Sequence, residues 1–251
     1  MARPVPMLLV ALLLSAAPGL ATAAGPGFPL QDSGADVGNQ ASLQRGAQLF
    51  MNYCLGCHSL QYVRYSTLAE GLGLTDEQVA ENLRFTGESS HDPITIAMPQ
   101  DAAASWFGQA PPDLSLMARA RGTDYIYTFL QSFYVDPASR VTGVNNKVLP
   151  GTSMPHVLWE LQGLQEAVYR QAPGPDGEPQ KVFDRFELVE PGSMTPEEYR
   201  QATRDITAFL SWAAEPMQLE RQRLGIKVLL FLLVLFAFSW LYYKELWKDV
   251  K

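Results

Sequence analysis

The chain has 251 residues and a net charge of −7, with 47% hydrophobic but only 18% charged residues. A soluble domain usually carries about a quarter charged residues, so the deficit predicts that part of the chain lies in lipid. The charge is uneven, because residues 25–214 hold 12 basic and 22 acidic residues, a net charge of −10. A domain this acidic argues against nucleic acid as a partner and favours a basic protein partner.

Residues 1–24 have the pattern of a secretory signal peptide. Arg3 gives a positive start, residues 7–14 form a short apolar core, and residues 21–23 (ATA) offer a small-residue cleavage site. The core is too short for a transmembrane helix. We therefore expect residues 25–222 to be exported, and the lack of an Arg- and Ser-rich transit segment favours a bacterial protein with this domain in the periplasm.

A second apolar stretch, residues 223–243, contains LLFLLVLFAFSWLYY, and after Arg223 at its first position its single charge is Lys227. About 20 such residues span a bilayer as a helix, and a lysine near one end can reach the headgroups. Aromatic residues near the other end take the position of an interfacial belt. We expect a single-pass anchor in the bacterial inner membrane, followed by a cytoplasmic tail at residues 244–251.

The segments between these two ends predict a mainly α-helical domain. Apolar residues recur at helical spacing over residues 39–57, and capping boxes at Thr75 and Thr195 predict helices that run to about Phe85 and Ala214. Other expected features are a helix over residues 113–121 with Asp113 as its N-cap, helices over 123–133 and from 157, loops over 86–112 and 134–158, a turn or insertion at 172–179, and a short strand pair within 181–190.

The only two cysteines lie in Cys54-Leu55-Gly56-Cys57-His58. Cys-x-x-Cys-His is the pattern of c-type haem attachment. Two thiols three residues apart can reach both vinyl groups at one porphyrin edge, and the next residue then places an imidazole under the iron as the proximal ligand. The motif therefore predicts one covalent haem c, held by Cys54 and Cys57 and ligated by His58.

Three other uses of the cysteine pair compete with haem attachment. A thioredoxin-like redox pair needs a βαβ setting, whereas the residues before Cys54 are predicted to be helical. A zinc site needs four ligands, but there is no second cysteine pair and His91 and His156 are scattered. A structural disulfide is the simplest use of two cysteines and remains an alternative.

The sixth iron ligand is open on the residue pattern alone. A methionine in an irregular loop can present its thioether to the iron and raises the reduction potential relative to two histidines. Met154, in PGTSMPH, and Met194, in PGSM, fit this equally well, and His156 is the alternative for a low-potential centre. The remaining candidates are His91, Met98 and Met117, of which Met117 is expected to be a core residue of a helix.

Several longer segments carry a resemblance to a known family. They are RGAQLFMNYCLGCHSLQYVRY, APPDLSLMARARGTDYIY, PGTSMPHVLWELQG, and FLSWAAEP before the apolar stretch. In this order they resemble the cytochrome c1 family, the haem-bearing subunits of the cytochrome bc1 complex (quinol–cytochrome c oxidoreductase). PPDLS-x-x-x-RAR and WAAEP are far more specific than Cys-x-x-Cys-His, and the resemblance covers nearly the whole chain after residue 24.

The resemblance implies roles for particular residues. It assigns Met154 as the axial methionine, so that His58 and Met154 are the two iron ligands. It assigns Arg121 as the partner of a haem propionate, and a bidentate guanidinium suits a buried carboxylate. It places Pro112 in a segment near the haem and Tyr125 as a nearby aromatic residue.

The resemblance also implies a fold and a function. The fold is a cytochrome c-like haem domain with loop insertions and one C-terminal transmembrane helix. The chain would take an electron from the Rieske iron–sulfur protein and pass it to a soluble or membrane-bound c-type cytochrome, as a redox subunit anchored against cytochrome b. The acidic insertion and extra cysteines of mitochondrial members are missing, so the docking surface is not implied. Two alternatives are a membrane-anchored cytochrome of a different oxidase or dehydrogenase and a haem-free exported protein.

Overall fold

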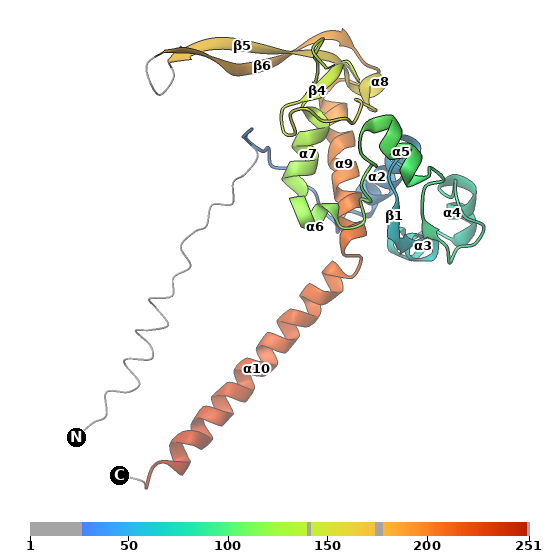
Figure 1. Cartoon of the computed structure of the whole chain (residues 1–251). Coiled ribbons are helices and arrows are strands. Elements are labelled where there is room, and N and C mark those ends of the chain that lie inside the picture. Colours follow the sequence, from blue (N-terminus) through green and yellow to red (C-terminus); the bar gives the residue numbers. More distant parts are fainter. Residues whose placement is uncertain (1–26, 140–141, 174–177, 250–251) are drawn as a thin grey trace.

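The structure is a computed structural model that describes residues 27–139, 142–173 and 178–249, so the predicted signal peptide lies outside it. The described chain is mainly helical, as predicted (Figure 1). Its helices are α2 (Gln40–Tyr53), α3 (Tyr65–Leu72), α4 (Asp76–Asn82), α5 (Gln100–Phe107), α6 (Met117–Arg121), α7 (Thr123–Gln131), α8 (Trp159–Gln162), α9 (Pro196–Ala214) and α10 (Gln218–Leu246). Antiparallel pairs are β1 (Leu60–Arg64) with β2 (Pro93–Ile94), β3 (Phe133–Val135) with β4 (Val144–Asn146), and β5 (Gly163–Pro173) with β6 (Pro179–Pro191).

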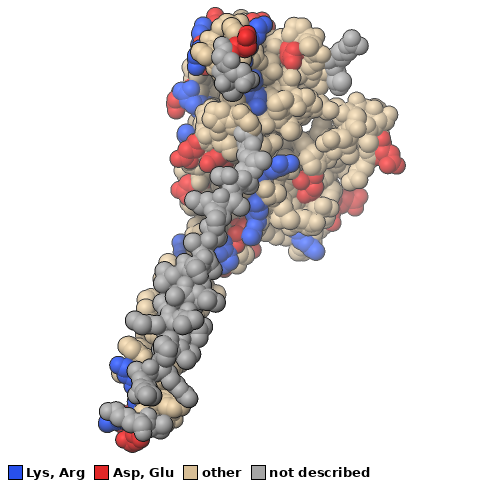
Figure 2. All heavy atoms as spheres, turned by 60° about the vertical axis from the view of Figure 1, so that its left-hand side comes forward, with Lys and Arg blue, Asp and Glu red and all other residues tan. Residues whose placement is uncertain are grey.

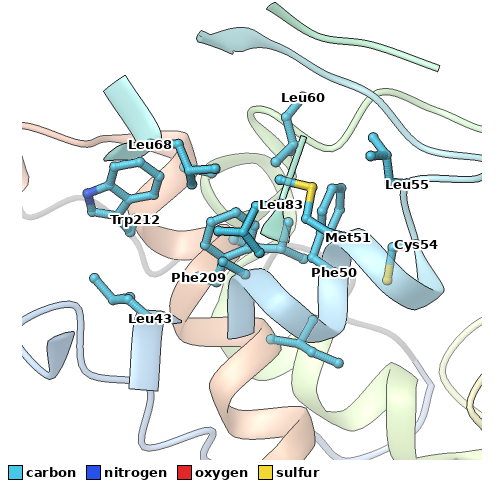
Figure 3. Close-up of a cluster of buried hydrophobic side chains, with 14 of the residues drawn as sticks. Leu43, Phe50, Met51, Cys54, Leu55, Leu60, Leu68, Leu83, Phe209 and Trp212 are labelled. Atoms are coloured by element: carbon cyan, nitrogen blue, oxygen red, sulfur yellow. The ribbon is translucent and has the colours of Figure 1, made fainter. Parts of the chain in front are cut away.

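Helices α2 and α9 cross in close contact at the centre of the domain. A Cβ atom added at Gly46 would lie 2.0 Å from the backbone oxygen of Asp205, so only glycine permits this approach. Next to the crossing, the fully buried rings of Phe50 and Phe209 lie 5.6 Å apart (Figure 3). The same hydrophobic cluster reaches the end of α2 at Cys54.

A buried carboxylate fastens the same two helices. The side chain of Asp205 on α9 is 2% exposed and accepts hydrogen bonds from three side chains. They are Ser42 Oγ at 2.5 Å, Arg45 Nε at 2.7 Å and Gln201 Nε2 at 2.9 Å. Because a buried charge is tolerated only when it is paired and hydrogen-bonded, this network makes the α2–α9 register specific.

Both predicted capping boxes are confirmed. The hydroxyls of Thr75 and Thr195 accept from the backbone N–H groups of Gln78 and Glu198, whose side chains accept in return from the two threonine N–H groups. The helix from Thr75 is shorter than expected and ends before Leu83. The predicted helices over residues 39–57 and 123–133 correspond to α2 and α7.

Two predicted loops contain regular structure. Residues 86–112 include β2 and α5, and residues 134–158 include the β4 strand that pairs with β3. The short strand pair expected within 181–190 is one strand, β6, of a long hairpin whose other strand is β5. Most of the hairpin is exposed on both faces, so its residues lack the alternation of apolar and polar side chains that reveals a half-buried strand.

Helix α10 is the predicted membrane anchor. It is long and apolar enough to cross a membrane, with a mean hydropathy of 2.4 over its most apolar window, none of which is buried against the rest of the chain. Figure 1 shows it leaving the domain directly below α9, and Figure 2 shows basic residues near both of its ends. The helix begins at Gln218, five residues before the predicted span.

Replacing Gly46 by alanine tests the helix crossing. Alanine favours an isolated helix, but here its Cβ would overlap the α9 backbone, so we expect Gly46→Ala to lower the free energy of unfolding by roughly 1–3 kcal/mol. Gln48→Ala, at an exposed position of α2, is the matched control and should change it by less than about 0.5 kcal/mol. Urea denaturation of the full chain in detergent, followed by circular dichroism, measures both; equal stabilities would contradict the tight crossing.

Candidate haem site

The Cys-x-x-Cys-His motif forms a tight turn where α2 ends. Cys54 is the C-cap residue and its N–H donates to the Phe50 carbonyl at 2.8 Å. The N–H groups of Cys57 and His58 both donate to the Cys54 carbonyl, at 3.0 and 2.9 Å. One carbonyl therefore gathers the two thiols and the imidazole around a single turn, and both cysteines are free.

The position of Cys54 does not favour a reactive thiol. Burial raises the pKa of its thiol to about 12, with the neighbouring Cys57 as the smaller cause. The negative end of the α2 dipole also disfavours a thiolate, whereas low-pKa cysteines lie at helix N-termini. Among the described residues, no group of three or more His, Cys, Asp or Glu side chains could hold a metal ion. The turn suits stable covalent attachment better than thiol redox chemistry or zinc binding.

His58 is buried and oriented by one strong contact. Its Nδ1 lies 2.7 Å from the backbone oxygen of Pro112. A carbonyl oxygen can only accept, so Nδ1 carries the proton and Nε2 keeps the lone pair that a metal needs. Burial lowers the pKa of His58, and the bond to Pro112 opposes that shift only in part. The imidazole is therefore neutral at neutral pH, as a haem ligand must be.

Residues 112–115, the PDLS of the PPDLS segment, are bonded to residues 58–62, directly after the motif. Besides the His58 contact, the bonds are Leu114 N–H to Ser59 O at 2.9 Å, Gln61 N–H to Asp113 Oδ2 at 3.0 Å, and Tyr62 N–H to Ser115 Oγ at 3.2 Å. The prediction that Asp113 caps a helix is wrong, because α6 starts at Met117 and Asp113 binds the β1 backbone instead. Sequence reasoning missed this role of Asp113 and Ser115, although both are residues that often bond to nearby backbone.

Arg121 and Tyr125 form a second part of the site. The guanidinium carbon lies 5.5 Å from the centre of the Tyr125 ring. Arg121 is exposed and has no carboxylate within salt-bridge distance among the described residues. The Tyr125 ring stacks on Phe129 at 6.2 Å, and Phe129 meets Phe133 at 5.0 Å. These rings form one continuous aromatic row from Arg121 to the start of β3.

Met154 lies in a third segment, and its half-buried side chain is outside the main hydrophobic cluster. Its N–H donates to Thr152 Oγ1 at 3.3 Å, within its own loop. Met117 and Met194, by contrast, both pack against that cluster. The structure thus joins Cys54, Cys57, His58 and Pro112 in one group and Arg121 with Tyr125 in another. No hydrogen bond links Met154 to either group among the described residues.

His156 completes the aromatic row. It is 7% exposed and its ring stacks in parallel on Phe133, with centroids 5.0 Å apart. Burial lowers the pKa of His156 to about 4, and the side chain of Gln162 opposes the shift. Its Nε2 has no hydrogen-bond partner among the described residues. The imidazole is a buried neutral group packed in the domain, two residues from Met154.

The chemistry of these groups fits a covalently bound haem. Two thiols and a neutral imidazole with a free Nε2 occupy one turn, which is the donor set of a c-type haem. Leu114, Met117 and Phe129 are half-buried apolar side chains near these groups, and a porphyrin needs apolar surroundings of this kind. The exposed guanidinium of Arg121 can pair with a carboxylate, and a propionate is one.

The chain is similar to proteins of known type along almost its full length. It is 50% identical to cytochrome c1 of Allochromatium vinosum over 97% of this chain and 98% of that protein. It is 38% identical to the ammonia monooxygenase gamma subunit of Nitrosomonas europaea, over 99% of both chains. The mitochondrial cytochrome c1 heme protein of Saccharomyces cerevisiae is 32% identical, over 85% of this chain and 68% of that one.

A family model, described as the Cytochrome C1 family, matches residues 35–167 and 178–250. The match includes the Cys-x-x-Cys-His turn, the PPDLS segment, Met154 and all of α10. With more than half of the chain matched and close relatives covered almost end to end, the conclusion is direct: this chain belongs to the cytochrome c1 family, haem-containing electron-transfer subunits of the cytochrome bc1 complex.

Proposed function

We propose that this chain takes one electron at a time from a Rieske iron–sulfur protein and passes it to a soluble or membrane-bound c-type cytochrome. The observation that carries the proposal is the turn at Cys54, Cys57 and His58, in which Pro112 holds the imidazole with Nε2 free. Membership of the cytochrome c1 family supports it. No bond of a substrate is made or broken by this subunit, which acts within quinol–cytochrome c oxidoreductase.

Each site residue has a distinct part in this proposal. Cys54 and Cys57 would hold the haem through thioether links, and His58 and Met154 would ligate its iron. Haem iron, when bound, supplies the one-electron change between the ferric and ferrous states. A thioether ligand in apolar surroundings would raise the reduction potential, because both disfavour the ferric charge. Arg121 pairs with a propionate.

The proposed location follows from the charge and the anchor. The domain of residues 25–222 lies in the periplasm of a bacterium, α10 crosses the inner membrane beside cytochrome b, and residues 244–251 form the cytoplasmic tail. The net charge of −10 over residues 25–214 suits brief docking of a basic cytochrome. Such docking weakens as salt rises.

A second candidate is a membrane-anchored cytochrome of a different oxidase or dehydrogenase. The observation that favours it is the similarity to a protein named as an ammonia monooxygenase gamma subunit. The two candidates differ in their membrane partner. Purification of the tagged full chain from its native membrane separates them, since cytochrome b should accompany it in the first case and be missing in the second.

The first prediction concerns covalent haem. The full chain, produced in cells that attach haem c, should retain one haem through acid–acetone extraction and give a c-type pyridine haemochrome spectrum. Cys54→Ser combined with Cys57→Ser should lose all haem in the extraction, because no thiol remains to bind it. Loss of haem from the unmodified protein would return the disulfide or thiol interpretation.

The second prediction concerns the sixth ligand. Met154→Leu should abolish the low-spin His/Met spectrum and lower the midpoint potential by on the order of 0.1 V, within the range of about 0.8 V that axial ligands control. Met194→Leu is the control, since Met194 packs against the core and should keep both the spectrum and the potential. The reverse result would move the ligand role to Met194.

The third prediction concerns Arg121. Arg121→Gln removes a positive charge near the haem. Loss of that charge stabilises the ferric form, so the midpoint potential should fall by on the order of tens of millivolts. Arg119→Gln loses a similar exposed charge two residues away, but Arg119 is paired with Glu215 at 3.4 Å. It should shift the potential less. Equal shifts in a redox titration would contradict a propionate contact specific to Arg121.

A further inference from the structure

The loop that carries Met154 is fastened to the domain by two neighbouring asparagines. Asn145 and Asn146 end strand β4, and residues 147–154 follow directly. Asn146 is fully buried, with an exposed fraction of 0%, and it lies opposite Phe133 in the β3–β4 pair. A buried amide is tolerated only when its polar atoms have partners, so the hydrogen bonds of Asn146 show what it holds.

The Asn146 amide has partners at both of its ends. Its Nδ2 donates to the backbone oxygen of Phe129 on α7 at 2.8 Å. Its Oδ1 accepts from the N–H groups of Val148 and Leu149, at 2.9 and 3.2 Å, and from Ser132 Oγ at 3.0 Å. Backbone N–H groups can only donate and a carbonyl can only accept, so these partners fix the orientation of the amide. One side chain thereby ties the start of the loop to the C-terminal end of α7.

Asn145 holds the next turn of the same loop. Its Oδ1 accepts from the Gly151 N–H at 2.8 Å, and its Nδ2 donates to Asp136 Oδ2 at 2.9 Å. Gly151 has a φ of 77°, in the left-handed region that favours glycine, so the chain turns sharply here. The Asn145 amide therefore secures the loop at its turn, three residues before Met154.

Two further hydrogen bonds lead from this loop to the methionine. The Thr152 N–H donates to the oxygen of Leu149 at 3.2 Å, and the Met154 N–H donates to Thr152 Oγ1 at 3.3 Å. Hydrogen bonds thus run in an unbroken series from Phe129 on α7, through the Asn146 amide and the loop, to Met154. Because Met154 lies outside the main hydrophobic cluster of the described residues, this series restrains the position of its thioether.

We propose that Asn146 is a positioning residue for the axial ligand, because it fixes the loop to α7 and so keeps the Met154 thioether at the iron. Asn145 supports it at the following turn. Helix α7 also carries Tyr125 and Phe129 of the aromatic row, so Asn146 joins the loop to that part of the site. The inference rests on the proposed function, because it assumes that Met154 binds the iron. Loss of either amide frees the loop and lets Met154 leave the iron more often.

Imidazole measures how often the methionine is away, since it binds ferric haem at the position that the thioether leaves. A looser loop raises the apparent imidazole affinity by the same factor as it raises the open population. We expect an increase of about tenfold for Asn146→Leu in the haem-loaded full chain in detergent, because leucine keeps the branched shape but makes no hydrogen bond. Asn145→Ala, at a half-buried position, frees only the turn and should give about threefold. This second variant tests the inference even where Asn146→Leu does not fold.

Two controls separate positioning from a general loss of stability. Val79 is 2% exposed on α4, and Figure 1 shows α4 and α7 on opposite sides of α9. Val79→Ala should lower the urea midpoint of unfolding and leave the imidazole affinity unchanged. Asn82→Ala removes an exposed amide that donates to the backbone oxygen of Gln78 at 2.8 Å, and it should leave the imidazole affinity unchanged as well.

The outcomes distinguish the positioning role from the ligand assignment. An imidazole affinity equal to wild type in both asparagine variants, or an equal rise in Val79→Ala, would overturn the positioning role. An unchanged spectrum of Met154→Leu would instead overturn the assignment of Met154 as the ligand, so the two failures have different signatures.

Amide hydrogen exchange of the loop gives a second measurement that does not depend on which methionine binds the iron. The N–H groups of Val148 and Leu149 should exchange slowly in the wild-type chain and faster in Asn146→Leu, because they lose their acceptor. Mass spectrometry of peptides that cover residues 147–154 follows this exchange. Equal exchange in the two proteins would show that Asn146 does not hold the loop and would overturn the proposal.

Discussion

The crossing of α2 and α9 is the constraint on which the rest of the domain depends. Gly46 lets the two backbones touch, and Asp205 holds their register from within the contact. These contacts fix the C-terminal end of α2 relative to α9, and Cys54 is the residue at that end. The Cys-x-x-Cys-His turn therefore lies at the end of a helix whose position is set by backbone contact, and rearrangement of side chains cannot relax that contact.

A second constraint orients the turn once α2 has placed it. The segment at Asp113 crosses back over residues 58–62 and supplies both the carbonyl for His58 and bonds to the β1 backbone. Proline at position 112 suits this task, since its restricted backbone gives a carbonyl with a fixed direction. The PPDLS segment thus orients the His58 imidazole. It does so through hydrogen bonds between two segments that lie about fifty residues apart in the chain.

The sequence predicted those features whose causes are local. The capping boxes at Thr75 and Thr195 each need four residues and the Cys-x-x-Cys-His motif needs five. Such short patterns can be recognised in the sequence without knowledge of the fold. The role of Asp113 was misread because a helix cap and a bond to a distant strand use the same side-chain oxygen. The hairpin of β5 and β6 was half missed because its stability comes from cross-strand pairs and an aromatic cluster around Phe183, which no local pattern encodes.

The WAAEP segment contains the junction between α9 and the membrane helix α10. Glu215, between α9 and α10, bonds to Arg221 of α10 and lies 3.4 Å from Arg119 of α6. The apolar window of α10 is not buried against the domain, and these ion pairs lie at the junction where α10 leaves it. Because α6 also ends at Arg121, one carboxylate links the direction of the anchor to the helix that carries the proposed propionate partner. Among the described residues, α10 is thus joined to the domain by the short chain segment after α9 and by the ionic contacts of Glu215.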